Sequence, residues 1–193
     1  MSENTRRIVV GISGSSAPIY GIRLLEALRA AGGVEIHLIL TEAARRTIGL
    51  ETGMSPAQVL ALGHVCYDNG DLAAAPASGS FRTGGMIVAP CSIHTLSAIA
   101  HSITDNLLTR AADVHLKERR DLILMVRETP LHLGHLRNMV LAAEAGATIL
   151  PPVPAFYHHP KTIDDIVNHS VGKALDLLSV PQNLFRRWGS PPE

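Results

Sequence analysis

The sequence has only two cysteines, Cys66 and Cys91, among 193 residues, which is too few for a disulfide framework. It also has no apolar run of about 18 residues, the length that a membrane-spanning helix needs. Its first residues, MSENTRRIVVG, lack the order of charged, apolar and then small residues that marks a secretory leader. These absences predict a cytoplasmic protein that does not enter a membrane.

An excess of charge of one sign is also absent, because 17 basic residues balance 17 acidic ones. No overall field therefore favours nucleic acid or an anionic membrane as a partner. Among the basic residues, lysine occurs three times and arginine fourteen times. Arginine suits bidentate contacts with anions and contacts between subunits.

The composition is 46% hydrophobic and 18% charged, which excludes a disordered chain. At this length we expect one domain over residues 1–193, with a tail, about residues 179–193, that contributes to the site or to a subunit contact. The apolar content of so short a chain also favours an oligomer.

Short apolar runs alternate with longer amphipathic ones. The short runs predict strands at residues 7–12, 34–40, 85–89, 121–126 and 147–150, and we expect Pro90 to stop the third. The amphipathic runs predict helices near residues 20–30, 41–48, 55–62, 92–101, 105–118, 132–145 and 163–178. Residues 64–84 have little periodicity and predict a loop with at most short strands. The alternation predicts an α/β fold whose parallel sheet is covered on both faces and binds ligands at the carboxyl ends of its strands.

Small and hydroxyl-bearing residues follow the first three predicted strands. Residues 11–18, GISGSSAP, form either a phosphate cradle or only a tight structural turn, and their glycine spacing does not fit GxGxxG. Thr41 ends the second strand, and Ser92 and Thr95 lie on the first turn of the helix after the third. Each of these hydroxyl groups is typical of a helix cap and is also suited to an anion site.

Charged and aromatic residues follow the last two predicted strands. Arg127 and Glu128 stand side by side after residues 121–126, where packing alone does not explain them. Tyr157 comes shortly after the last strand. Because the carboxyl ends of parallel strands meet at one edge of a sheet, a single pocket explains these side chains better than separate coincidences.

Ten histidines raise the question of a metal site. His132 and His135 are three residues apart, and His158 and His159 are adjacent. However, no HExxH motif is present, and no cluster of cysteine or aspartate completes a ligand set. We therefore expect no metal, and histidines that are exposed or cap helices.

Several long motifs stand in a fixed order: GISGSSAPIYGIRLL, ASGSFRTGGMIVAPCSIHTL, DNLLTRAADVHLKERRDLILMVRETPL, HLRNM, PPVPAFYHHP and a late RRWG. They span about residues 7–189, and in them the chain resembles the UbiX flavin prenyltransferases. The resemblance implies a flavodoxin-like, three-layer fold and metal-free transfer of a dimethylallyl group from dimethylallyl monophosphate to N5 and C6 of reduced FMN. It also implies a homododecamer built from trimers, and a product, prenylated FMN, that passes to a UbiD-type decarboxylase.

The resemblance further implies roles for particular residues. FMN would be held by Gly14, Ser15, Ser16, Thr41, Ser92, Ile93, His94, Thr95 and Arg127, and which of these groups takes the FMN phosphate stays open. The donor phosphate would meet Arg110, Lys117, Tyr157 and Lys173, with Trp188 close to the allyl group. Glu128 would be the acid/base group, and Ser16, near the flavin N5, and Glu51 would be the other catalytic residues.

The implied chemistry agrees with these residue types. Departure of phosphate leaves an allyl cation, which aromatic faces stabilise, and a phosphate dianion, which arginine and lysine neutralise without a metal. Lys173 stands where the family more often has arginine, so the charge is kept but the bidentate geometry is lost. This departure leaves the donor preference, monophosphate or diphosphate, open.

Two alternatives remain at this stage. An FMN-dependent cysteine decarboxylase would share the fold and the cofactor, but the chain has RETP and LKERR and lacks the PxMNxxM motif of that class. A non-catalytic flavin carrier, or an accessory subunit of an aromatic acid decarboxylase, would have no use for donor-phosphate residues such as Lys117 and Tyr157.

Overall fold

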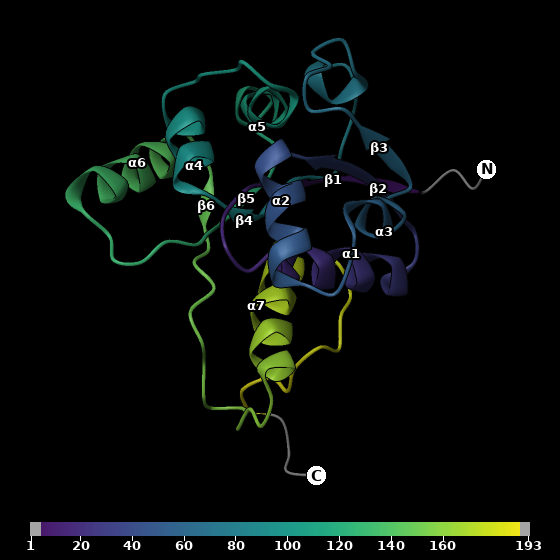
Figure 1. The fold of residues 1–193 in the computed structure, drawn as a ribbon, viewed down its shortest axis with the longest axis vertical. Coiled ribbons are helices and arrows are strands. Elements are labelled where there is room, and N and C mark those ends of the chain that lie inside the picture. Colours follow the sequence, from purple (N-terminus) through teal and green to yellow (C-terminus); the bar gives the residue numbers. More distant parts are fainter. Residues whose placement is uncertain (1–4, 190–193) are drawn as a thin grey trace.

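The computed structural model describes residues 5–189, which form a six-stranded sheet with helices on both faces (Figure 1). All strand pairs are parallel, and the order across the sheet is β3-β2-β1-β4-β5-β6. The strands are β1 (Arg6–Ile12), β2 (Val34–Leu40), β3 (Val65–Tyr67), β4 (Met86–Cys91), β5 (Leu122–Val126) and β6 (Thr148–Ile149). From β1 at the centre, the chain adds β2 and β3 on one side. It then returns to the centre and adds β4, β5 and β6 on the other side.

The helices divide into two layers. One face of the sheet packs against α1 (Ile19–Ala31), α7 (Ile163–Leu177) and residues of α2 (Glu42–Glu51) and α3 (Pro56–Leu60). The other face packs against α4 (Ile93–Ala100) and α5 (Leu107–Lys117), with α6 (Leu133–Glu144) at its margin. A short 3-10 helix, η1 (Ala75–Ala77), lies beside α5. This is the three-layer α/β sandwich with a parallel sheet that the sequence predicts.

Side-chain alternation along the strands supplies both cores. Ile8, Val10 and Ile12 of β1 enter the core under α1 and α7, while Val9 between them enters the core under α4 and α5. All four side chains are fully buried. Because both faces are covered, the strand is a continuous apolar run and not an alternating one.

The prediction that Pro90 stops the third strand is wrong, since β4 continues to Cys91. Proline has no N–H to donate to a neighbouring strand and is tolerated where pairing is irregular. The register between β4 and β5 shifts between Val88 and Cys91, on either side of this residue. The Pro90 carbonyl instead accepts hydrogen bonds from the backbone N–H and the hydroxyl of Ser13, at 3.2 and 2.8 Å.

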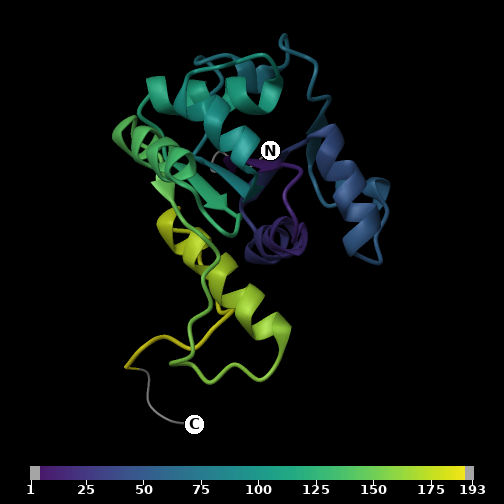
Figure 2. The same ribbon diagram turned by 60° about the vertical axis from the view of Figure 1, so that its left-hand side comes forward.

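The segment after β6, helix α7 and the tail extend away from the sheet in both ribbon views (Figures 1 and 2). Arg23 of α1 holds the start of α7 through an ion pair with Asp164 at 3.0 Å. No helix within residues 5–189 has the length and apolar character to cross a bilayer.

Helix α6 has an apolar face that the described chain leaves uncovered. Among its twelve residues only Ala142 is buried. Leu133, Leu136 and Val140 are 59%, 45% and 56% exposed. Apolar side chains gathered in this way on one helix are typical of a contact with another chain.

A buried histidine ties the loop before β4 to α5 and predicts a pH-dependent stability. His115 is 1% exposed, and its ring nitrogens lie 2.7 Å from the Ala111 carbonyl oxygen and 2.8 Å from the Thr83 hydroxyl. Burial lowers the pKa of His115 below its ordinary value of 6.5. The unfolded chain therefore binds a proton more readily, so the stabilisation is present above about pH 6.5 and is lost as the pH falls through the folded-state pKa.

We expect the free energy of unfolding to fall between pH 7.5 and 5.5, and to fall less steeply in His115→Gln. Part of the slope should remain, because burial also lowers the pKa of His37 and of His169. Urea denaturation at several pH values measures both slopes. Equal slopes for the two proteins would show that His115 does not contribute.

Candidate active site

A buried serine joins the ends of the two central strands. The Ser13 hydroxyl donates to the Pro90 carbonyl at 2.8 Å and accepts from the Ser92 N–H at 2.7 Å. Ser13 is 1% exposed, so both bonds form away from water. The turn after β1 and the start of α4 are thereby fixed against each other.

The same turn comes very close to the start of α2. A Cβ atom built on Gly14 would lie 2.3 Å from the Cβ of Ala43, which is closer than real contacts allow. Only glycine fits this position without displacing the backbone, so the glycine serves a close approach between two segments. The gap between these segments opens into a cavity.

Most of the residues that line this cavity of about 320 Å³ carry a polar side chain, and we call it the polar cavity. The sequence-predicted residues Gly14, Thr41, Ser92, His94 and Thr95 line it together. Asn69 and Asn106 line it as well, and sequence reasoning missed them. The only available signal for Asn106 was its place directly before a helix, and Asn69 lies in the segment without periodicity.

The cavity lies at the amino-terminal ends of three helices. Thr41 accepts from the Ala44 N–H at 3.0 Å, Ser92 from the Thr95 N–H at 3.2 Å, and Asn106 from the Thr109 N–H at 3.1 Å. The hydroxyl groups therefore act as helix caps and also face the cavity. Helix amino termini carry partial positive charge, so the cavity favours an anion although no lysine or arginine lines it.

The two serines that follow Gly14 make different contacts. The Ser15 hydroxyl donates to the Arg127 carbonyl at 2.7 Å, which ties the turn to the end of β5. The Ser16 hydroxyl donates to the Glu51 carboxylate at 3.0 Å, and the Ala17 N–H donates to the same oxygen at 2.7 Å. Ser16 and Glu51, two residues predicted to be catalytic, are thus hydrogen-bonded to each other.

Arg127 and Glu128 lie at the carboxyl edge, as their position after β5 predicts. The Arg127 N–H donates to the Cys91 carbonyl at 3.1 Å, and its side chain is half-buried. Burial raises the pKa of the nearby Tyr20 above its ordinary value. A hydrogen bond with Ser170 and the positive charge of Arg127 lower this pKa, but by less than burial raises it. Glu128 is exposed and accepts from the Thr129 N–H at 2.9 Å.

Within residues 5–189, no ion pair joins Glu128 to Arg127 or to any other cation. Its carboxylate is therefore not held as a salt-bridge partner of its neighbour. It remains available to a group bound at the edge of the sheet.

The residues predicted to meet the donor phosphate fall into two separate groups. Arg110 and Lys117 lie on α5, where Arg110 bonds the Ala77 carbonyl at 3.1 Å and Asp113 at 2.8 Å. Lys117 pairs with Glu118, and this contact lowers the pKa of the Glu118 carboxyl. Tyr157, Lys173 and Trp188 lie on α7 and the segments before and after it, and α7 covers the opposite face of the sheet from α5 (Figures 1 and 2).

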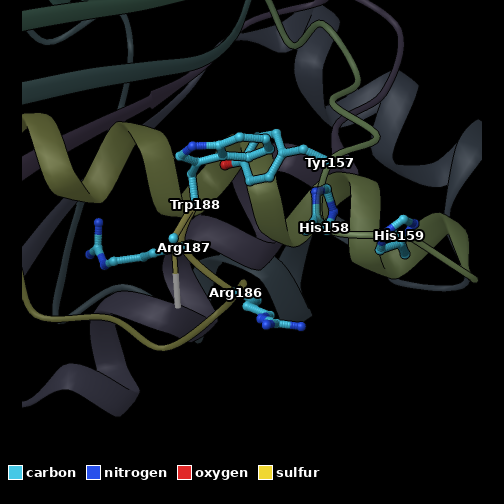
Figure 3. Close-up of a pocket in the computed structure, with 7 residues that line it drawn as sticks. Tyr157, His158, His159, Arg186, Arg187 and Trp188 are labelled. Atoms are coloured by element: carbon cyan, nitrogen blue, oxygen red, sulfur yellow. The ribbon is translucent and has the colours of Figure 1, made fainter. Parts of the chain in front are cut away.

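Two residues of the second group, Tyr157 and Trp188, are in contact. The rings of Tyr157 and Trp188 meet edge to face with centroids 5.6 Å apart. They line a pocket of about 330 Å³ together with His158, His159, Arg186, Arg187 and Gly189 (Figure 3). A single chain therefore does not bring together all the residues predicted to meet the donor phosphate.

Two residues predicted to hold FMN line a second space. Ile93 and His94 line a groove of about 650 Å³ between α4 and α6, together with the rings of His132 and His135. His94 lies between this groove and the polar cavity and lines both. Across the part of the chain that the structure describes, no group of three or more potential ligands could hold a metal ion.

Comparisons with known proteins place this geometry in context. A family model described as Flavoprotein matches residues 1–175. The flavin prenyltransferase UbiX of Escherichia coli K12 is 58% identical over 185 residues, which is 95% of this chain and 98% of that protein.

Two solved structures are also similar. A crystal structure of AnUbiX (PadA1) with FMN and dimethylallyl pyrophosphate has a TM-score of 0.94 at 48% identity, covering 97% of this chain and 99% of that one. A dodecameric FMN-dependent UbiX-like decarboxylase from Escherichia coli O157:H7 has a TM-score of 0.93 at 46% identity, covering 95% and 100%. These similarities do not favour a cysteine decarboxylase or a non-catalytic carrier.

The close approach at Gly14 gives a direct test of the site's geometry. Gly14→Ala should lower the free energy of unfolding by about 1–3 kcal/mol, the usual cost of overpacking. Gly49→Ala in α2 is the control, since a Cβ there meets nothing within 4 Å, and it should stabilise the helix by about 0.5–1 kcal/mol. Guanidinium denaturation measures both values, and equal effects would contradict the packing argument.

Proposed function

The chain belongs to the family of UbiX flavin prenyltransferases, and we propose that it transfers the dimethylallyl group of a prenyl phosphate to N5 and C6 of reduced FMN. The observation that carries this proposal is the 58% identity to the E. coli enzyme across 95% of the chain. The polar cavity at the carboxyl edge of the sheet supports it, because open α/β sheets bind their ligands there. The protein is thus a prenyl-transferring enzyme for which FMN is a substrate.

The residues at the edge of the sheet fit FMN in two parts. The phosphate end is proposed to enter the cavity of Gly14, Thr41, Ser92 and Thr95, where hydroxyl groups and helix amino termini supply hydrogen-bond donors. The ring is proposed to lie toward Ser16 and Arg127. When bound, reduced flavin supplies the nucleophilic nitrogen and carbon.

Glu128 is proposed as the acid/base group. Its carboxylate is exposed and free of ion pairs within the described residues, so it can accept a proton from the flavin edge or give one to the leaving phosphate. Glu51 holds the Ser16 hydroxyl and the Ala17 N–H. We propose that these two hydrogen bonds to Glu51 orient the Ser16 side chain toward the flavin.

The donor phosphate is proposed to bind between two chains. Arg110 and Lys117 of one protomer would meet Tyr157, Lys173 and Trp188 of another. In a single chain the first two lie on α5 and the others on α7 and the segments beside it, and α5 and α7 cover opposite faces of the sheet (Figure 1). The dodecameric relative supports an oligomer, and the uncovered face of α6 supports a contact surface. We propose a homododecamer built from trimers.

The donor is proposed to be dimethylallyl monophosphate, although the AnUbiX structure holds dimethylallyl pyrophosphate. The chain is proposed to act in the cytoplasm and to pass prenylated FMN to a UbiD-type decarboxylase. We propose neither nucleic acid nor a membrane as a partner, since the balanced charge of the sequence favours neither.

Anaerobic incubation with reduced FMN and each donor, followed by mass spectrometry of the flavin, tests the activity. We expect the flavin to gain one dimethylallyl unit, with the monophosphate as the better donor. Flavin recovered unchanged with both donors would contradict the proposed function. Preference for the diphosphate would correct only the donor.

Glu128 variants test the proposed proton transfer. Glu128→Ala and Glu128→Gln should both slow single-turnover prenylation by roughly two to four orders of magnitude, since each removes the acid/base group. FMN affinity should change little, because Arg127 and the hydroxyl groups remain. Loss of FMN affinity with turnover preserved at saturating flavin would show that Glu128 only orients the binding site.

Substitutions on α6 test the proposed contact surface. Val140→Asp places a charge on the exposed apolar face and should reduce the assembly to smaller species in multi-angle light scattering. Leu72→Asp is the control, because Leu72 is similarly exposed, at 46% against 56%, but lies outside α6. An unchanged assembly for Val140→Asp would place the subunit contact elsewhere.

A further inference from the structure

The hydroxyl group of Tyr157 is held by a histidine from a different element. Its oxygen lies 3.0 Å from Nε2 of His169, which is on α7, whereas Tyr157 lies in the segment between β6 and α7. Tyr157 is 38% exposed and lines the pocket shown in Figure 3. One side of the phenol therefore faces His169, and the ring borders the pocket.

His169 cannot easily turn away from this contact. It is 8% exposed, and the ring of His158 stacks on it with centroids 4.9 Å apart and planes 7° from parallel. Phe185 of the tail packs against it at 4.7 Å. Rings from two other segments, the one before α7 and the tail, thus fix the orientation of one imidazole.

The charge state of His169 follows from its surroundings. Burial lowers its pKa below the ordinary 6.5, and the nearby charges of His158 and Lys173 lower it further. From the tail, Arg187 lies 5.7 Å over the Phe185 ring and is paired with Asp176. His169 is therefore neutral at neutral pH, with one ring N–H.

The neutral imidazole determines what the phenol can do. If Nε2–H donates to the phenol oxygen, the Tyr157 O–H is left to donate in another direction. A phosphate oxygen in the pocket can only accept, and hydrogen bonds to such charged acceptors are the strong ones. His158 also lines the pocket, but both of its ring nitrogens are buried and have no hydrogen-bond partner within residues 5–189.

We propose that His169 is a positioning residue that fixes the Tyr157 phenol so that its O–H donates to the phosphate of the prenyl donor. The proposal rests on the proposed function for the identity of the anion. His169 itself does not touch the donor. Its effect should therefore appear in donor binding, through Tyr157, and not in flavin binding.

Three variants separate this role from a purely structural one. His169→Phe keeps a ring for the stack but removes the N–H, and should raise the KM for dimethylallyl monophosphate about tenfold, the usual loss for one hydrogen bond to a charged group. His169→Gln places an amide nitrogen near the position of Nε2 and should restore a KM within about twofold of the original protein. Tyr157→Phe should match His169→Phe, and the double variant should be no worse than either single variant.

Steady-state kinetics on the assembled protein, with FMN affinity and thermal unfolding measured in parallel, tests these expectations. A KM effect of His169→Phe that adds fully to that of Tyr157→Phe would overturn the proposal. So would a His169→Gln variant as impaired as His169→Phe, since the packing would then matter and the N–H would not.

Binding of inorganic phosphate, measured by calorimetry, keeps the test independent of turnover. If the original protein binds phosphate but prenylates no flavin, the proposed function fails while the role of His169 is still decided by the two phenylalanine variants. If prenylation proceeds and neither variant changes phosphate binding or donor KM, the inference about His169 fails alone.

Discussion

The candidate site depends on one buried hydrogen-bonded link between the two central strands. The Ser13 hydroxyl bonds the Pro90 carbonyl and the Ser92 N–H at the ends of β1 and β4. The strand order reverses between these two strands, which is where a doubly wound sheet opens a crevice for a ligand. Ser13 therefore fixes the turn after β1 against the start of α4, and with it the position of Gly14 relative to Ser92 in the polar cavity.

Two kinds of anion site are combined in the proposed enzyme. The polar cavity offers capped helix amino termini and hydroxyl groups, which suit an anion that stays in one orientation during the reaction. The proposed donor site offers lysine, arginine and tyrosine, which suit a phosphate that must leave with a full negative charge. The first lies within one chain, and the second is proposed to need two chains, so assembly and donor binding are linked.

The sequence predicted the elements and strand ends well, for physical reasons. Parallel strands buried on both faces must be continuous apolar runs, and the residue after each such run must lie at the carboxyl edge, as Thr41 and Arg127 do. The prediction from sequence failed where a structural feature depends on residues far away in the chain. Pro90 was expected to end a strand, but the pairing irregularity that accommodates it depends on β5.

Other residues were hidden for similar reasons. Asn69 lies in a segment without periodicity, and Ser13 looked like one small turn residue among several, although its two bonds bridge 77 and 79 positions of the sequence. His169 looked like an ordinary position of an amphipathic helix, because its partners come from two distant segments. The sequence alone could not show that Lys117 and Tyr157 lie apart in one chain: Lys117 ends α5 and Tyr157 precedes α7, and these helices cover opposite faces of the sheet (Figure 1).

Subunit complementation tests the central claim, that donor binding needs residues of two chains, most directly. Chains carrying Lys117→Ala and chains carrying both Tyr157→Phe and Lys173→Ala are co-expressed in equal amounts, and prenylation by the purified hybrid is compared with each variant alone. Random pairing should leave about a quarter of the sites intact in the hybrid, so we expect activity near a quarter of that of the original protein. Hybrid activity no higher than that of the two variants would show that each donor site is built within a single chain.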